Sequence, residues 1–340
     1  NYDINQSWRL DSNDKDDLSL LYLNIIKSKV TTVCIQFNYS FFDFSAFSEL
    51  VLKLHNKTNI ILLMHSTTDP QSVSNKKLYL LTNALQKCKR ILVHTIADLN
   101  RLKSINIVNN VSLFPHGFID SEFTNLRNSR LTSIHKFLPI LPKYKISSYG
   151  FCLPNKGFQE LIKAVKVLKD MHYNIELNIF SAIYSETYKY VYDDLIDLVN
   201  TLELNKYVNT FTEYTSDEKT LECLANQDLV VFPYQNTNES SSAAVRTGLA
   251  SLRPVLVTPV PIFDDVSSLV HYLPGKSSTD IASGISNFLS QLKTNKKVLD
   301  RFQRNKYETI DSLRFSRLTD RLLNMINAIE LDNSNEFNSS

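Results

Sequence analysis

The segment from Leu229 to Asp265 constrains the fold of this chain more than any other part of the sequence. It opens with an apolar run, Leu229–Tyr234, whose length and β-branched residues predict a strand buried on both faces. After a polar loop, the small residues of Ala243–Ala250 predict a short helix with serines at its capping end. Pro254–Val260 predicts a second buried strand. The segment is therefore expected to form a parallel βαβ unit.

The start of this predicted helix is a candidate site for an anion. The first backbone N–H groups of a helix have no partner within the helix, and they lie at the positive end of its dipole. Ser240, Ser241 and Ser242 stand at this start. We therefore expect a diphosphate group to bind near these three serines.

Length and composition limit the class of protein. With 340 residues, of which 43% are hydrophobic and 21% charged, the chain is expected to form about two globular domains rather than a disordered chain. The net charge is +2, and the lysines and arginines are dispersed along the sequence. This distribution argues against a general nucleic-acid-binding protein.

The cysteines and the termini suggest where the protein works. The four cysteines lie far apart and form no Cys-x-x-Cys pair, which predicts buried free thiols in a reducing compartment. No stretch approaches the roughly 18 apolar residues of a membrane-spanning helix, and no signal peptide opens the chain. We expect a cytoplasmic protein, at most peripheral at the inner membrane face. Because the chain begins with Asn, we also expect it to be part of a longer polypeptide.

Strands and helices are predicted to alternate along the chain. Further strands are predicted at residues 30–37, 59–64, 90–94, 111–114, 146–149, 175–180, 208–211 and 270–273. Further helices are predicted at residues 14–27, 41–55, 74–87, 96–103, 158–171, 187–202, 217–225, 280–292, 297–310 and 315–329. This alternation predicts parallel, Rossmann-like α/β sheets that bind ligands at the carboxyl ends of their strands.

The predicted elements divide into two domains. Residues 1–117 form the N-terminal domain, which we expect to be incomplete because no Gly-rich first turn is visible. Residues 118–143 form a linker, residues 144–330 the second domain, and residues 331–340 a disordered tail. In the first domain, the carboxyl ends of the strands carry Gln36, Asn38, His65, His94 and His116.

Several short motifs lie at or near the ends of the predicted strands. They are His65, VHTIADLNRL at residues 93–102, FPHG at 114–117, YGFCLPNKGFQELIKAV at 149–165, Glu239, and Pro254-Val255. In this order and spacing they resemble the motifs of the GT-B-fold retaining glycosyltransferases of family 4. The resemblance implies two Rossmann-like domains that face a cleft, with a nucleotide-diphosphate sugar as donor bound in the second domain.

The resemblance also implies roles for individual residues. Glu239 stands where the family contacts the donor sugar, and His65 where a histidine faces that sugar, so both are predicted catalytic residues. The predicted substrate-binding residues are Gly150, Lys156, Ser240, Ser241, Ser242, Arg246, Thr247 and His116. The chain departs from the family at two positions that contact the nucleotide: Thr247 replaces a glutamate at the ribose, and Phe151 replaces an arginine at the diphosphate.

Transfer from such a donor leaves negative charge on the departing diphosphate, which the site must stabilise. Lys156 and the helix start at Ser240–Ser242 can do this without a metal ion, and no Asp-x-Asp pair suggests one. If the family chemistry holds, the acceptor hydroxyl attacks from the side that the diphosphate leaves, and the anomeric configuration is retained. We therefore expect no cofactor and no metal.

Ordinary structural roles compete with each of these assignments. Glu239 can be a solvated loop carboxylate, Lys156 a surface lysine, and His65 a structural histidine at a strand end. His94 and His116 show no spacing of metal ligands. Asp264 and Asp265 can line a ligand site or cap a helix.

Three functions stay open at this point. The first is an active hexosyltransferase that uses a glycan or lipid-linked acceptor, in the synthesis of surface polysaccharide or glycoconjugate. The second is a catalytically silent GT-B module that binds glycan or a partner protein, which Phe151 and Thr247 favour. The third is a related GT-B enzyme such as a sugar-nucleotide epimerase, which the order of motifs disfavours.

Overall fold

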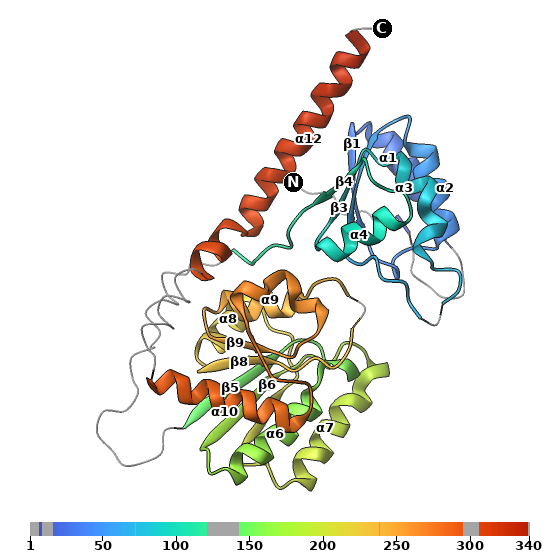
Figure 1. Cartoon of the computed structure of the whole chain (residues 1–340). Coiled ribbons are helices and arrows are strands. Elements are labelled where there is room, and N and C mark those ends of the chain that lie inside the picture. The colour runs from blue at the N-terminus through green and yellow to red at the C-terminus, as the bar shows by residue number, and fades with distance from the viewer. Residues whose placement is uncertain are drawn as a thin grey trace. The chain divides into compact units, whose positions relative to one another are not determined.

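A computed structural model describes residues 7–8, 16–71, 73–120, 143–237, 239–294 and 306–338 of the chain. The chain folds into two compact units (Figure 1). Unit 1 comprises Asn1–His116, Asn238–Ser241 and Arg317–Ser340, and unit 2 comprises Gly117–Thr237 and Ser242–Ser316. The boundary between His116 and Gly117 falls one residue from the predicted end of the first domain.

Unit 1 is built around a four-stranded parallel sheet with the order β1-β2-β3-β4. Its strands are β1 (Thr32–Phe37), β2 (Asn59–Met64), β3 (Arg90–Val93) and β4 (Val111–Leu113). Its helices are α1 (Ser19–Ser28), α2 (Phe44–Leu54), the 3₁₀ helix η1 (Leu78–Leu81), α3 (Thr82–Lys87), α4 (Ile96–Ser104) and, from Arg317 onward, α12 (Phe315–Asn338). The four predicted strands of the first domain are confirmed.

Helix α2 shows how the sequence builds this unit. Asp43 caps its start by accepting hydrogen bonds from the backbone N–H groups of Ser45 and Ala46. Its apolar residues recur at spacings of three and four, and the predicted face is buried. The buried residues are Phe44, Phe47, Leu50, Val51 and Leu54. Burying one such side chain contributes about 1.5–3 kcal/mol, so this face fixes the helix in the core of unit 1.

Strand β1 is only partly buried. It pairs with β2 alone among the described strands, and its exposure alternates along the strand. Cys34 is exposed, whereas Cys88 and Cys152 are buried and Cys223 is half-buried; all four thiols are free. The prediction of buried thiols was therefore wrong for Cys34, because a strand with one pairing partner contacts neighbouring elements on fewer sides than a central strand.

Helix α12 continues to Asn338, through residues 331–338 of the predicted tail. Asparagine and serine have weak helix propensity, but extending an existing helix avoids the cost of nucleation. In unit 1, Glu330 of α12 accepts hydrogen bonds from the hydroxyls of Thr31 at 2.5 Å and Thr32 at 2.8 Å. These bonds connect α12 to the start of β1, beside which it runs in Figure 1.

Unit 2 contains a six-stranded parallel sheet with the order β10-β9-β8-β5-β6-β7. Its strands are β5 (Tyr144–Tyr149), β6 (Ile175–Phe180), β7 (Val208–Phe211), β8 (Leu229–Phe232), β9 (Val255–Val257) and β10 (His271–Tyr272). Its α-helices include α6 (Phe158–Asp170), α7 (Lys189–Thr201), α8 (Asp217–Ala225), α9 (Ala243–Ala250) and α10 (Ser278–Thr294). Its 3₁₀ helices are η2 (Pro154–Lys156), η3 (Glu186–Tyr188) and η4 (Pro261–Leu269). The predicted α/β fold, with a βαβ unit formed by β8, α9 and β9, is confirmed.

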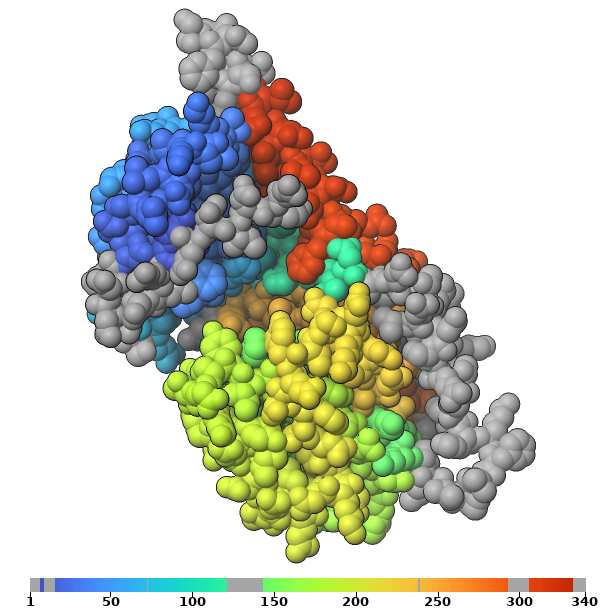
Figure 2. Space-filling view, turned by 180° about the vertical axis from the view of Figure 1, so that it is seen from behind, coloured from blue at the N-terminus to red at the C-terminus, as the bar shows by residue number. Residues whose placement is uncertain are grey.

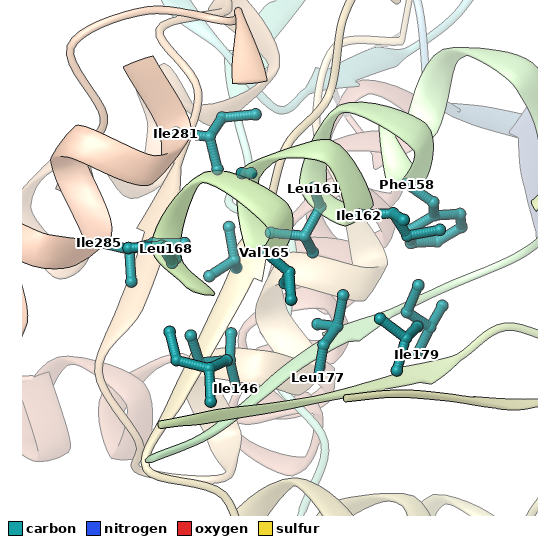
Figure 3. Packing of buried hydrophobic residues seen from close by; sticks show 14 of the residues in the cluster. Ile146, Phe158, Leu161, Ile162, Val165, Leu168, Leu177, Ile179, Ile281 and Ile285 are labelled. Atoms are coloured by element: carbon teal, nitrogen blue, oxygen red, sulfur yellow. The ribbon is translucent and has the colours of Figure 1, made fainter. Parts of the chain in front are cut away.

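The core of unit 2 lies between the sheet and its covering helices. Figure 3 shows the apolar side chains of α6 packed over β5 and β6 and beside α10. The labelled residues are Ile146, Phe158, Leu161, Ile162, Val165, Leu168, Leu177, Ile179, Ile281 and Ile285, all at most 2% exposed. Helices α7 and α8 (yellow-green to yellow) form the face of unit 2 that Figure 2 presents. Helix α6 is thereby held rigidly, with its N-terminus at the carboxyl end of β5.

The start of the predicted linker is part of unit 2. Phe118 is only 1% exposed, and its backbone forms an isolated parallel bridge with Arg314. Asp120 accepts hydrogen bonds from the backbone and side chain of Ser316 at 2.9 and 2.6 Å. Residues 121–142 of the predicted linker lie outside the described residues.

A buried lysine gives a stability prediction for unit 2. Lys306 is 1% exposed, and its ammonium donates a hydrogen bond to the carbonyl of Arg253. Burial, together with the charge of Arg253, lowers the pKa of Lys306 from 10.5 to about 7. Between these two values the unfolded chain holds a proton that the folded chain does not, so stability rises with pH across this window.

We expect Lys306→Met to stabilise the protein at pH 7 by up to about 4 kcal/mol, because methionine at position 306 has no proton to lose on burial. The lost hydrogen bond to the Arg253 carbonyl offsets part of this gain. Denaturant unfolding at pH 7 and pH 9.5 measures both the gain and the flattened pH dependence. Lys166→Met, on an exposed lysine paired with Asp170, is the matched control and should change neither. An unchanged pH slope in Lys306→Met would contradict the assignment.

Candidate functional site

The topology of unit 2 places a candidate site at one position of its sheet. The strands β5, β6 and β7 extend in one direction from β5, and β8, β9 and β10 extend in the other. In doubly wound α/β sheets, ligands bind where the strand order reverses, beyond the carboxyl ends of the strands. Here that point lies between β5 and β8, where the loop into α6 and the loop into α9 are neighbours.

Two glycines let these loops approach each other. Gly157, at the start of α6, has a φ of 74°, and a Cβ there would lie 1.8 Å from the carbonyl oxygen of Pro233, just after β8. Gly150, at the end of β5, has a φ of 137°, and a Cβ there would lie 3.5 Å from the Cβ of Ala244 in α9. The backbone of the first loop therefore lies directly against the second loop and the first turn of α9.

Lys156 brings a positive charge to the same place. Its ammonium lies 4.1 Å from the centre of the Tyr234 ring, a cation–π contact. The hydroxyl of Tyr234 lies 3.3 Å from that of Ser242, which caps α9 by accepting a hydrogen bond from the backbone N–H of Val245. Gly150, Lys156 and Ser242, three of the predicted substrate-binding residues, are thus brought together within unit 2, beside the N-terminus of α9. This set can bind an anion through one cation and free helix N–H groups.

The other two serines are placed differently. Ser240 belongs to the segment grouped with unit 1, and its hydroxyl donates a 2.6 Å hydrogen bond to Asp98 in that unit. Ser241 is half-buried, and only Ser242 caps the helix. The prediction that all three serines form the helix start was therefore wrong for Ser240, whose hydroxyl is bonded elsewhere.

Arg246 and Thr247 are buried in α9, at 4% and 6% exposure. The Arg246 guanidinium forms an ion pair with Asp265 and donates to the carbonyl of Ser242 at 3.1 Å. The Thr247 hydroxyl donates to the carbonyl of Ala243 at 3.3 Å. Burial raises the pKa of the Asp265 carboxyl, and the charge of Arg246 opposes this shift. The side chains of Arg246 and Thr247, both predicted to bind substrate, thus make hydrogen bonds inside unit 2. Asp265, predicted either to line a ligand site or to cap a helix, forms a buried ion pair with Arg246.

In unit 1 the carboxyl ends of β2, β3 and β4 bring three histidines together. The ring centres of His65 and His94 are 5.3 Å apart, those of His94 and His116 5.0 Å, and those of His65 and His116 6.4 Å. His65 Nε2 lies 2.7 Å from the Gln36 side-chain oxygen. His94 is buried, and its Nδ1 donates to the Phe114 carbonyl at 3.0 Å. The four parallel strands therefore form a polar edge in unit 1.

Glu239 lies in the segment Asn238–Ser241, which belongs to unit 1 together with the three histidines. It is exposed, and its negative charge raises the pKa of His65, whereas burial, the larger effect, lowers it. The predicted catalytic residues His65 and Glu239 are therefore close enough to interact within unit 1. An imidazole near a carboxylate can donate a hydrogen bond to a hydroxyl group or accept one from it.

Sequence reasoning missed Tyr234 and Asp98 as members of these sites. The apolar run of β8 predicted only that Tyr234 was buried in a strand. The Thr-x-x-Asp pattern at Thr95–Asp98 signals a capping box at the start of α4, and the structure contains it. No local pattern links Asp98 to Ser240, because 142 positions separate them.

The described residues contain no group of three or more His, Cys, Asp or Glu side chains that could hold a metal ion. None of the helices, searched over the same residues, is long and apolar enough to span a membrane.

No protein-family model and no curated protein sequence matches this chain. Solved structures do match it. A glycosyltransferase from Rickettsia africae is 14% identical, with a TM-score of 0.70, over 92% of this chain and 80% of that protein. The Anabaena protein HepE, in complex with UDP, is 13% identical, with a TM-score of 0.68, over 91% and 82%.

Sucrose-phosphate synthase from Thermosynechococcus elongatus is 10% identical, with a TM-score of 0.70, over 92% of this chain and 77% of that protein. These structural neighbours are glycosyltransferases of the GT-B type. The two parallel sheets of four and six strands agree with two Rossmann-like domains. The chain therefore has the GT-B fold that the order of its motifs predicted.

Proposed function

We propose that this chain is a metal-independent, retaining hexosyltransferase that moves a sugar from a nucleotide-diphosphate sugar to a hydroxyl of a glycan or lipid-linked acceptor. We further propose that it acts in the synthesis of surface polysaccharide or glycoconjugate. The observation that carries the proposal is the convergence of Gly150, Lys156 and the start of α9 where the strand order of unit 2 reverses.

The chemistry of this arrangement fits a departing diphosphate. The glycosidic C–O bond breaks, and negative charge grows on the leaving phosphate oxygen. The Lys156 ammonium and the N–H groups at the start of α9 stabilise this charge. The Tyr234 ring that the ammonium contacts carries no negative charge, so the positive charge of Lys156 remains available to the diphosphate. The acceptor hydroxyl then bonds to the anomeric carbon from the face that the diphosphate leaves, and its proton passes to the leaving phosphate.

The structural neighbours support the class of donor. HepE has been solved with UDP, with UDP and glucose, and with UDP-glucose. Trehalose-6-phosphate synthase, whose structure is described in connection with glycosyl transfer with retention, matches this chain with a TM-score of 0.67. These relationships favour a uridine-diphosphate sugar as the first donor to test and retention as the expected stereochemistry.

Lys156→Ala is expected to weaken the binding of UDP about tenfold to a hundredfold, because one charge-assisted contact contributes about 1.5–3 kcal/mol. Calorimetric titration with UDP measures this loss. Lys163→Ala, on an exposed lysine of α6, removes the same charge and should leave the affinity unchanged. If Lys156→Ala bound UDP as tightly as the parent, Lys156 would not belong to the diphosphate site.

Glu239→Gln is expected to reduce the rate of sugar transfer at least about tenfold, roughly 1.4 kcal/mol of barrier, with little change in UDP affinity. The reason is that its carboxylate accepts hydrogen bonds from the donor sugar and orients the anomeric carbon. A matched control, Glu222→Gln on the exposed side of α8, should transfer at the parental rate. A parental rate in Glu239→Gln would remove Glu239 from the catalytic site.

Two observations favour the alternative of a silent module that binds glycan or a partner protein. Phe151 is 40% exposed at the position where the family resemblance implies a diphosphate-binding arginine. At the position where the resemblance implies a ribose-binding glutamate, the uncharged Thr247 hydroxyl donates a hydrogen bond to the Ala243 carbonyl within α9. A parent protein that binds nucleotide sugars but transfers none to any acceptor or to water would favour this alternative.

A further inference from the structure

A buried carboxylate in unit 1 collects hydrogen bonds from three parts of the chain. Asp98 is fully buried, and its Oδ1 accepts from Thr67 Oγ1 at 2.5 Å, from Arg101 Nη1 at 3.0 Å and from Ser240 Oγ at 2.6 Å. Its Oδ2 accepts from the backbone N–H and the hydroxyl of Thr95 at 3.2 and 2.5 Å. The capping of α4 requires only the contacts between Thr95 and Asp98. The hydrogen bond from Ser240 to Asp98 is not needed for capping and instead connects α4 to the segment around Glu239.

Ser240 directly follows Glu239 in the chain. Ser240 is 9% exposed, whereas Glu239 is exposed. The segment is therefore anchored by the buried serine, and the neighbouring Glu239 carboxylate faces solvent. Neither residue lies in a helix or strand, and the regular hydrogen bonding of α9 starts only after Ser242. A hydrogen bond to an ionised acceptor is about twice as strong as one between neutral groups. The Asp98 contact is therefore a strong restraint on the position of this segment.

We propose that Asp98 is a positioning residue of unit 1 that fixes the segment carrying Glu239 through the Ser240 hydroxyl, and thereby keeps the Glu239 carboxylate near His65. The catalytic consequence rests on the proposed function, but the placement of Glu239 does not. Because Glu239 contacts the sugar in that function, Asp98 acts on the rate of transfer through Ser240 and Glu239.

Ser240→Ala isolates this contact. The variant removes one hydroxyl, and Asp98 keeps its bonds to Thr67, Arg101 and Thr95, including the ion pair with Arg101. No buried charge is left unpaired, so we expect the variant to fold. Thr95→Ala is the control, because it removes the hydroxyl that donates to Oδ2 and leaves the backbone bond to Oδ2 and the Ser240 bond to Oδ1 in place.

The first readout is the pKa of His65, measured by NMR titration of labelled histidines in the whole chain. The groups near His65 are the Gln36 side chain, the rings of His94 and His116, and the charge of Glu239. Only the last of these changes in the variants. Since the Glu239 carboxylate raises the pKa of His65, Glu239→Gln should lower it, and Ser240→Ala should lower it in the same direction. Thr95→Ala should leave it unchanged.

The double variant Glu239→Gln/Ser240→Ala decides whether the two effects share one cause. We expect Ser240→Ala to add nothing to the pKa shift of Glu239→Gln. In the transfer assay, Ser240→Ala should lower the rate about tenfold in the parent and not at all in the Glu239→Gln background, with UDP affinity unchanged in both. A parental His65 pKa in Ser240→Ala, or a full additional effect in the double variant, would overturn the proposal. If the parent transfers no sugar, the proposed function fails while the titration still decides the role of Asp98.

Discussion

Arg246→Met is expected to destabilise unit 2 by about 3–5 kcal/mol, because it leaves the Asp265 carboxylate buried without its cation. The side chains of Arg246 and Asp265 are 4% and 9% exposed, so water cannot replace the lost partner. The guanidinium also lies over the Phe118 ring, at 5.7 Å from its centre, and methionine retains part of that contact. Denaturant unfolding at pH 7 measures the loss.

The pH dependence of the variant tests the cause. Burial already raises the pKa of Asp265, and Arg246 opposes this effect. Without Arg246, the folded-state pKa of Asp265 lies above its unfolded value, so the unfolded state releases its proton first as the pH rises. Arg246→Met should therefore be most stable near pH 4 and lose stability toward pH 7. A variant whose destabilisation is independent of pH would contradict this explanation.

Replacing both Arg246 and Asp265 tests whether Arg246 serves only to stabilise unit 2 or also contacts the substrate. Replacing a buried ion pair with apolar residues of similar volume is often neutral or stabilising. We therefore expect Arg246→Met/Asp265→Leu to recover most of the stability lost in Arg246→Met. If the double variant also binds UDP as the parent does, Arg246 supports α9 but does not contact the nucleotide. Lys166→Ala, which breaks the exposed pair with Asp170, should cost no more than about 0.5 kcal/mol.

Gly157→Ala is expected to destabilise unit 2 by about 2–4 kcal/mol and to abolish tight binding of UDP. A left-handed backbone costs an alanine about 1–2 kcal/mol, and overpacking adds about 1–3 kcal/mol. At Gly157, where φ is 74°, the new methyl group would lie 1.8 Å from the Pro233 carbonyl oxygen. Because that atom is backbone, relief requires the loops after β5 and β8 to separate, which moves Lys156 away from the start of α9.

Gly275→Ala is the matched control for this substitution. A Cβ at Gly275 would lie 2.3 Å from the carboxylate of Asp280, a side-chain end that can shift at the cost of its hydrogen bonds with Ser277, whereas the backbone at Pro233 cannot. We expect a smaller loss of stability and parental UDP affinity. Unfolding curves and UDP titrations of both glycine variants test the comparison, and parental UDP affinity in a folded Gly157→Ala would contradict the role given to these loops.

The sequence predicted the elements of the fold well wherever local chemistry decides them. The bounds of α9 follow from small residues preceded by a capping serine, and the parallel pairing of the strands follows from the alternation of apolar runs with helical patterns. The ends of strands were less accurate. Strand β8 was predicted to reach Tyr234 but stops at Phe232, because Pro233 has no N–H to donate. Pro254 and Pro259 flank β9 in the same way, and it is shorter than predicted.

The placement of side chains far apart in sequence could be predicted only in part. That His65, His94 and His116 share one edge follows from three parallel strands, each with a histidine just beyond its end. The burial of Arg246 could not be predicted, since its partner Asp265 lies 19 positions away on η4 and their approach depends on packing. The capture of Ser240 by Asp98 depends on tertiary contacts in the same way.

Titration of the parent protein with UDP-, GDP- and dTDP-sugars, followed by assay of the nucleoside diphosphate released, tests the central claim most directly. The expected result is that at least one of these donors binds, that Lys156→Ala weakens its binding, and that Glu239→Gln slows release without weakening binding. Product from a suitable acceptor should then keep the anomeric configuration of the donor sugar. A parent protein that binds none of these donors at millimolar concentration would contradict the proposal that this GT-B fold uses a nucleotide sugar.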